Sequence, residues 1–109
     1  MKLVAAIVQE YDANKLVRAV VQAGFRATVI GSTGGFLRTG NTTILSAVED
    51  PDVGSLLEVI AANCRERTEM VRPELIGDYS DWYPPQEVEV LVGGATVFVV
   101  PVSHFERVF

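Results

Sequence analysis

Residues 3–8 read LVAAIV, six consecutive apolar side chains near the start of the chain. Successive side chains of a strand point to opposite faces, so a strand built from this run is apolar on both faces. Such strands are typical of the centre of a sheet that is covered on both sides. A strand at residues 95–100 would also be apolar on both faces, because Val97 and Val99 alternate with Phe98 and Val100. We therefore expect a sheet that needs burial on two faces.

The length of the chain limits how that burial is achieved. We expect the 109 residues to form one domain, residues 1–109, without enough chain for a third layer. Burying half of a second sheet face would contribute several kcal/mol, at about 25 cal/mol per Å². We therefore expect copies of the chain to associate in a ring with their sheets facing inward.

Two helices are predicted from apolar residues at helical spacing. The first begins with Asp12 as its N-cap and ends at Gly24, a residue suited to the position after a helix. The second has Asp50 as its N-cap and Pro51 in its first turn, and it runs out at residues 65–67. The apolar faces comprise Leu16, Val17, Val20 and Val21, then Val53, Leu56, Leu57, Ile60, Ala61 and Cys64.

Apolar segments also predict strands, which besides residues 2–9 are residues 25–30, 44–48, 88–92 and 95–100. Gly93 and Gly94 separate the last two and predict a tight hairpin turn. Residues 69–86, which are interrupted by proline and glycine, predict a long loop. Ser103 and Glu106 have the spacing of a capping box, so we expect a helical turn near the end.

The resulting order is strand, helix, strand, strand, helix, strand, strand. It predicts an α+β fold, a ferredoxin-like βαββαβ core with an added C-terminal strand. Right-handed crossovers place both helices on one face of the sheet.

Catalytic and metal-binding patterns are absent from the sequence. Neither a phosphate-binding P-loop nor a dinucleotide-binding glycine pattern occurs. His104, the one histidine, is expected to be an exposed or capping residue, and Cys64 a buried structural thiol. Clustered metal ligands are not visible at a suitable spacing. We therefore expect no enzyme, no metal site and no cofactor.

Composition points to the cytoplasm and away from nucleic acid. The net charge of −5 disfavours a general nucleic-acid binder, which needs a basic surface. No run approaches the roughly 20 apolar residues of a membrane span. One cysteine excludes an internal disulfide and fits a reducing compartment.

The polar, glycine-rich residues 32–43 form the candidate binding segment between two predicted strands. Backbone N–H groups at Gly34 and Gly35, with the Arg38 guanidinium, suit a phosphate. Asn41 has both a donor and an acceptor for a base edge, and Phe36 suits stacking on a ring.

Arg26 and Thr28 share one face of the incoming strand and extend this candidate surface. Each residue also has a structural explanation: a surface arginine for Arg26, a turn residue for Asn41, and a packed plug for Phe36. Together on one hairpin they favour a nucleotide ligand.

The chain resembles the PII-like cyclic-di-AMP receptors of the DarA/PstA type over nearly its whole length. The segments that carry the resemblance are AIVQ at 6–9, GFRAT at 24–28, STGGFLR at 32–38, GNTT at 40–43 and VGGATVFV at 92–99. The resemblance implies a homotrimeric, cytoplasmic signal-transduction protein without enzymatic activity. Its ligand would bind in clefts between subunits, beneath a T-loop at about residues 31–40 and a B-loop at about residues 68–86.

The resemblance also implies which residues meet the ligand. Arg26 and Thr28 would contact phosphate and polar groups, and Asn41 would bond adenine. Ala47 stands where the family has glycine, so its methyl group would lie near the ligand. The complete set of candidate ligand-binding residues is Arg26, Thr28, Gly35, Phe36, Leu37, Arg38, Asn41, Ala47, Gly93, Gly94 and Phe98.

Three functions remain open at this stage. The first is a sensor that binds cyclic-di-AMP and passes the signal to a downstream protein through loop rearrangement. The second is a PII-like sensor of ATP or another adenine nucleotide. The third is an interaction module that binds a protein and no nucleotide.

Overall fold

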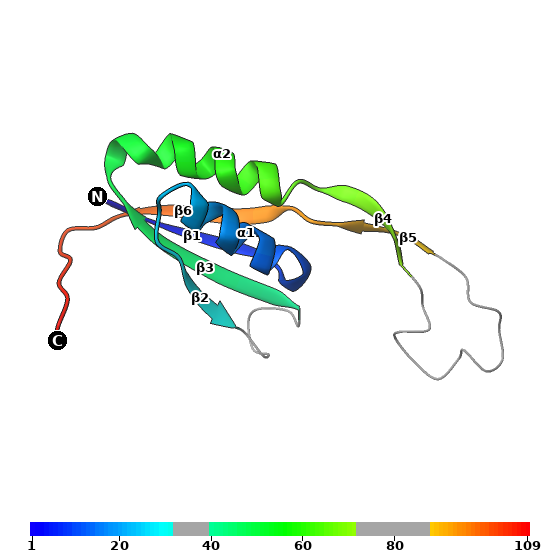
Figure 1. Ribbon diagram of the computed structural model, residues 1–109, viewed down its shortest axis with the longest axis horizontal. Helices are drawn as coiled ribbons and strands as arrows, with labels where there is room; N and C mark the ends of the chain where they lie inside the picture. Colours follow the sequence, from blue (N-terminus) through cyan, green and yellow to red (C-terminus); the bar gives the residue numbers. More distant parts are fainter. Residues whose placement is uncertain (32–39, 72–87) are drawn as a thin grey trace.

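The computed structural model describes residues 1–31, 40–71 and 88–109. Its elements are β1 (Lys2–Gln9), α1 (Glu10–Gln22), β2 (Thr28–Gly31), β3 (Asn41–Val48), a 3-10 turn (Asp50–Asp52), α2 (Val53–Asn63), β4 (Arg67–Val71), β5 (Val88–Val92) and β6 (Ala95–Pro101). Figure 1 shows a mixed α/β arrangement in which the two helices lie against one sheet and β4 and β5 extend away from it.

The main sheet has the order β2-β3-β1-β6, and every neighbouring pair in it is antiparallel. The predicted central position of β1 is confirmed, since Ala5 lies opposite Leu45 of β3 on one side and opposite Phe98 of β6 on the other. This order and the two intervening helices are compatible with a ferredoxin-like core.

The prediction that the last strand is added to the core was wrong. β6 is itself a strand of the main sheet, whereas β5 pairs with β4 in a separate two-stranded sheet, hereafter the ribbon. Gly93 and Gly94 therefore do not close a hairpin between β5 and β6, and they instead carry the chain from the ribbon into the main sheet. Two adjacent glycines signal an unusual backbone, and they do not identify the partners of the flanking strands.

β4 was missed because its sequence, RTEMV, is short and mostly polar. It takes strand geometry through pairing with β5, with Glu69 opposite Val90 and Thr68 opposite Leu91. Residues 68–71 of the predicted B-loop are thus part of a strand, and residues 72–86 lie outside the described residues. Of the predicted T-loop, Gly31 belongs to β2 and residues 32–39 lie outside the described part.

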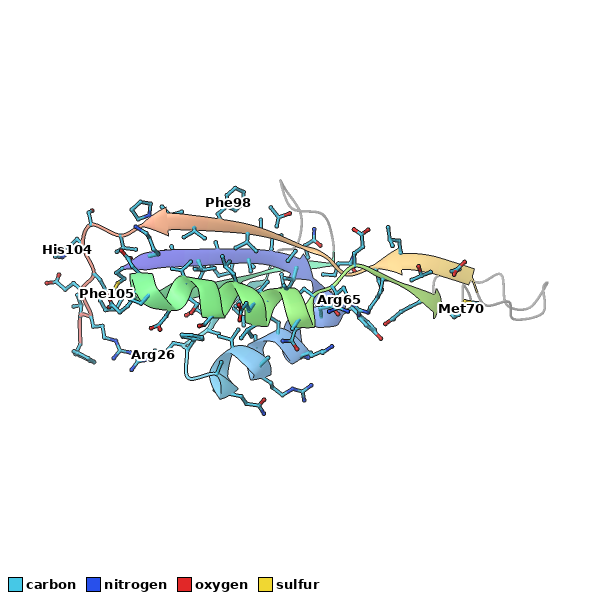
Figure 2. The ribbon with its side chains drawn as sticks, turned by 90° about the horizontal axis from the view of Figure 1, so that it is seen from above. Arg26, Arg65, Met70, Phe98, His104 and Phe105 are labelled. Carbon is cyan, nitrogen blue, oxygen red and sulfur yellow. The ribbon has the colours of Figure 1, made fainter. Side chains whose placement is uncertain are left out.

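The core lies between the helices and one face of the main sheet. β1 buries Val4, Ala6 and Val8, the alternate residues that face the helices. The side chains that complete the core are Ala13, Leu16, Val20, Ile44, Val48, Leu56, Ile60 and Cys64. Figure 2 shows both helices on one side of β1 and β6, as predicted, and Phe98 on the opposite side.

The opposite sheet face is largely apolar, and no other described part of the chain covers it. Cross-strand register places Ala5, Leu45 and Phe98 together on it. Phe98 is 54% exposed and Val100, two residues further on the same face, is 47% exposed. The face that the two apolar strands predicted is therefore present, and it is hereafter called the open face.

Several predicted element ends shift in the structure. The α1 helix begins at Glu10 after Gln9, so Asp12 is a buried helical residue and the prediction that it caps the helix was wrong. Gly24 does follow the helix, with a φ of 93°, while the N–H of Phe25 bonds the Val20 carbonyl. This pair of features is the Schellman arrangement that ends a helix.

The second helix also starts differently from the prediction. Glu49 and not Asp50 precedes the 3-10 turn, and Asp50 instead lies 3.0 Å from the backbone ammonium of Met1. That ammonium, followed by the Lys2 charge, lowers the pKa of Asp50. α2 ends at Asn63, before the predicted residues 65–67.

Two further local predictions were wrong in extent. The strand predicted at residues 25–30 begins at Thr28, whereas the one predicted at residues 44–48 begins at Asn41. The expected C-terminal helical turn does not form, because residues 102–109 have no helical structure.

Candidate functional site

A cleft of about 370 Å³ lies where β1 ends, β3 begins and the chain passes from the ribbon into β6. The residues that line it are Ile7, Val8, Gln9, Asn41, Glu66, Gly93, Gly94, Ala95 and Thr96. Gln9 and Asn41 lie directly opposite each other in the β1–β3 register, so two carboxamide side chains meet at this end of the sheet. Both carry a hydrogen-bond donor and an acceptor, which makes the cleft suited to a polar, ring-shaped ligand.

The two glycines of the cleft have backbone conformations that other residues rarely adopt. Gly93 and Gly94 have φ values of 91° and 85°. At Gly93 a Cβ atom would lie 2.4 Å from the Arg65 carbonyl oxygen, closer than atoms can approach. Glycine is thus required here by both conformation and space.

Hydrogen bonds fix these glycines to the body of the protein. The Gly93 N–H donates to Oε1 of Gln9 over 2.8 Å, and the Gly94 N–H donates to the carbonyl of Cys64. Since both N–H groups are used internally, the glycines shape the cleft wall and do not offer these donors to a ligand.

A partly buried ion pair joins α1 to the ribbon. Asp12, which is 1% exposed, accepts two bonds from Arg67, of 2.7 Å at Oδ1 and 3.3 Å at Oδ2. The same guanidinium donates to Glu69 over 3.0 Å and lies 5.5 Å from the centre of the Tyr11 ring. Bidentate contacts of this kind fix geometry as well as charge, so Arg67 ties the ribbon to α1.

This cluster changes the proton affinities of its members. The hydrogen bonds that Arg67 donates to Asp12 and Glu69 raise its pKa still further, so it stays charged. A hydrogen bond with Glu69, followed by its negative charge, raises the pKa of Tyr11. Burial raises the pKa of the nearby Cys64 thiol to about 11, which supports the expected structural role of that residue.

The structure brings three of the candidate residues together in the cleft: Asn41, Gly93 and Gly94. Thr28, Ala47 and Phe98 lie on the open face, opposite Leu45, Leu3 and Ala5 in the cross-strand register.

Arg26 lies elsewhere. It precedes β2, the edge strand opposite to β6, and Figure 2 shows it far from Phe98. The remaining candidates, Gly35, Phe36, Leu37 and Arg38, lie outside the described residues.

Gln9, Glu66 and the Asp12–Arg67 pair were not identified from the sequence. Gln9 was explained as the last residue of a strand and Asp12 as a helix cap, so neither indicated a site. The one signal in the sequence was the pair Arg67 and Glu69. These two opposite charges have the spacing of a strand at the start of the expected loop. Their roles depend on contacts between residues as far as 84 positions apart in the chain.

Other kinds of site find no support among the described residues. Within residues 1–31, 40–71 and 88–109, no group of three or more potential metal ligands is present. No helix in that part of the chain is both long and apolar enough to cross a membrane. His104 is exposed at the C-terminal tail.

Comparisons with known proteins identify the family of the chain. A family described as the cyclic-di-AMP receptor matches residues 1–108. A crystal structure of a protein of unknown function from Pediococcus pentosaceus ATCC 25745 is 42% identical, with a TM-score of 0.75, over 98% of this chain and 96% of that one. The chain belongs to the cyclic-di-AMP receptor family.

Proposed function

We propose that the chain is a PII-like signal-transduction protein that binds cyclic-di-AMP in clefts between the subunits of a homotrimer. Binding would rearrange the loops that follow β2 and β4 and so pass the signal to a downstream protein in the cytoplasm. The protein would act without catalysis and without a cofactor. Membership of the receptor family is the observation that carries this proposal.

The composition of the cleft supports a shared site. Ligand sites typically occupy about 300–1,000 Å³, so 370 Å³ is small for a dinucleotide. Among the described residues that line it, none is a lysine or arginine, although the ligand has two phosphates. Arg26 lies on another part of the same chain, so a second subunit is a suitable source of such a charge.

The open face supports the assembly. Phe98 and Val100 are about half exposed in the single chain, and apolar faces of this kind mark interaction surfaces. A cyclic arrangement covers the same face in every copy. Thr28, Ala47 and Phe98 would then lie at or beside the contact between subunits.

Isothermal titration with cyclic-di-AMP, ATP and cyclic-di-GMP tests the proposed ligand. We expect saturable binding of cyclic-di-AMP at one site per chain, with weaker or no binding of the others. Tight ATP binding without a cyclic-di-AMP signal would favour the adenine-nucleotide sensor. An absence of binding heat with all three nucleotides would favour the protein-interaction module.

Variants test the proposed site. Arg26→Ala and Asn41→Ala should each weaken cyclic-di-AMP binding by about tenfold, the equivalent of losing one hydrogen bond to a charged or well-placed group. Arg18→Ala, which removes an exposed arginine of α1, is the control for the loss of charge. Unchanged affinity in both site variants would place the ligand elsewhere.

A further inference from the structure

We propose that Glu66 and Gln9 read the base of the ligand, and that Glu66 selects a 6-amino purine over a 6-oxo purine. This inference rests on the proposed function and extends it to two residues that line the cleft beside Asn41.

Glu66 supplies a carboxylate to the wall of the cleft. Its Oε2 lies 3.8 Å from the point where a Cβ atom of Gly94 would stand, so the carboxylate sits over the glycine backbone. An ionised carboxylate accepts hydrogen bonds and donates none. It also repels phosphate, so this end of the cleft suits the base of a nucleotide and disfavours its phosphate.

Gln9 supplies a donor whose orientation is fixed. A backbone N–H can only donate, so the 2.8 Å contact from Gly93 must end on the oxygen of the Gln9 carboxamide. This bond fixes which way the carboxamide is turned, and its Nε2 group is the donor that Gln9 can offer to a ligand. Asn41, directly opposite on β3, has no such constraint among the described contacts.

This combination of one acceptor and one donor matches adenine. Adenine has a donor at N6 and acceptors at its ring nitrogens, whereas a 6-oxo purine has an acceptor in place of the N6 amine. The Glu66 carboxylate would accept from N6, and Gln9 Nε2 would donate to a ring nitrogen. A 6-oxo base would instead turn the lone pairs of its O6 toward the negatively charged carboxylate, which repels them.

The test compares two ligands of equal charge, cyclic-di-AMP and cyclic-di-IMP, which carries a 6-oxo group in place of the amine. Competition titrations give the ratio of their affinities, from which any general effect of protein charge cancels. The wild-type protein should prefer cyclic-di-AMP. Glu66→Gln, whose side chain can either accept or donate, should reduce that preference by about tenfold.

Two further variants make the result specific. Glu58→Gln removes the same charge from an exposed position on α2 and should leave the preference unchanged. Gln9→Glu keeps an oxygen for the Gly93 N–H but replaces the donor, so cyclic-di-AMP affinity should fall while the Gly93 amide remains protected from hydrogen exchange. Circular dichroism of each variant verifies that the fold is retained.

The outcomes separate this inference from the function on which it rests. If the wild-type protein binds no cyclic-di-AMP, the proposed function fails. Suppose instead that the wild-type protein binds it, that Glu66→Gln leaves the preference within about twofold of wild type, and that Gln9→Glu leaves the cyclic-di-AMP affinity within about twofold. The proposed function then stands and the roles of these two residues are refuted.

Discussion

Among the described glycines, Gly93 is the one with the least room for a side chain, and Gly24 provides a matched comparison. Both have a positive φ, of 91° and 93° respectively. A Cβ atom at Gly93 would collide with the Arg65 carbonyl oxygen, whereas one at Gly24 would have no atom within 4 Å. The two positions therefore separate the cost of conformation from the cost of a clash.

We expect Gly24→Ala to lower the free energy of unfolding by about 1–2 kcal/mol, the cost of a left-handed alanine. Gly93→Ala should cost more than this, because the Arg65 backbone must also move. Urea denaturation of the two variants measures the difference. Equal losses of unfolding free energy would show that the backbone around Gly93 accommodates a methyl group without a clash.

Cys64 gives a prediction for alkaline pH. Its folded pKa is raised to about 11 from an ordinary value of 9.0, chiefly by burial. The unfolded chain therefore loses this proton first, so the free energy of unfolding should be unaffected below pH 9 and fall between pH 9 and 11. Cys64→Ala should remove that part of the decline, as measured by urea denaturation across this range. An identical decline in the variant would assign it to other groups.

At the scale of elements, the ribbon depends on Arg67. Two paired strands are rarely stable alone in water, and here they are joined to α1 through the buried Asp12 carboxylate. The ribbon is thus held to helix α1 by this ion pair, although it is a sheet of its own.

Arg67→Ala should lower the urea midpoint and speed hydrogen exchange in β4, because it leaves Asp12 buried without its partner. Arg65→Ala removes the same charge from an exposed neighbour and should do neither. Asp12→Asn combined with Arg67→Ala should recover part of the loss, since no unpaired charge is then buried. Equal effects of Arg67→Ala and Arg65→Ala would contradict the role of the ion pair.

The elements also show which parts of this fold follow from local sequence. β1, both helices and the Gly24 ending were predictable because their signals lie within about ten residues of each other. The ribbon was not, because RTEMV has no strand pattern of its own and becomes a strand by pairing with residues about 20 positions later. The hairpin turn predicted at Gly93 and Gly94 was wrong, because the role of these glycines depends on Gln9 and Cys64, which are distant in the chain. The same distance hid Gln9 and Glu66 as members of the cleft.

For the whole molecule, the open face gives the test of assembly. Val100 is 47% exposed on that face, and Val21 is 57% exposed on α1, so the two valines differ in location more than in exposure. Val100→Lys should convert the proposed trimer to monomer by placing charges in the contact, whereas Val21→Lys should leave it intact. Light scattering measures both. A trimer that tolerates Val100→Lys would show that the subunits meet through another surface.

The junction at Gly93 and Gly94 is the point about which the ribbon would rotate relative to the main sheet. Five residues of strand span about 17 Å at roughly 3.3 Å per residue. A rotation of about 10° at the glycines would therefore move the far end of the ribbon by about 3 Å, by the geometry of a rigid strand pair. The junction is held by two hydrogen bonds, from Gly94 to the carbonyl of Cys64 and from Gly93 to Gln9, a residue of the cleft. Gln9 thus both lines the cleft and holds the junction, so a ligand that moves Gln9 would also change the direction of the ribbon.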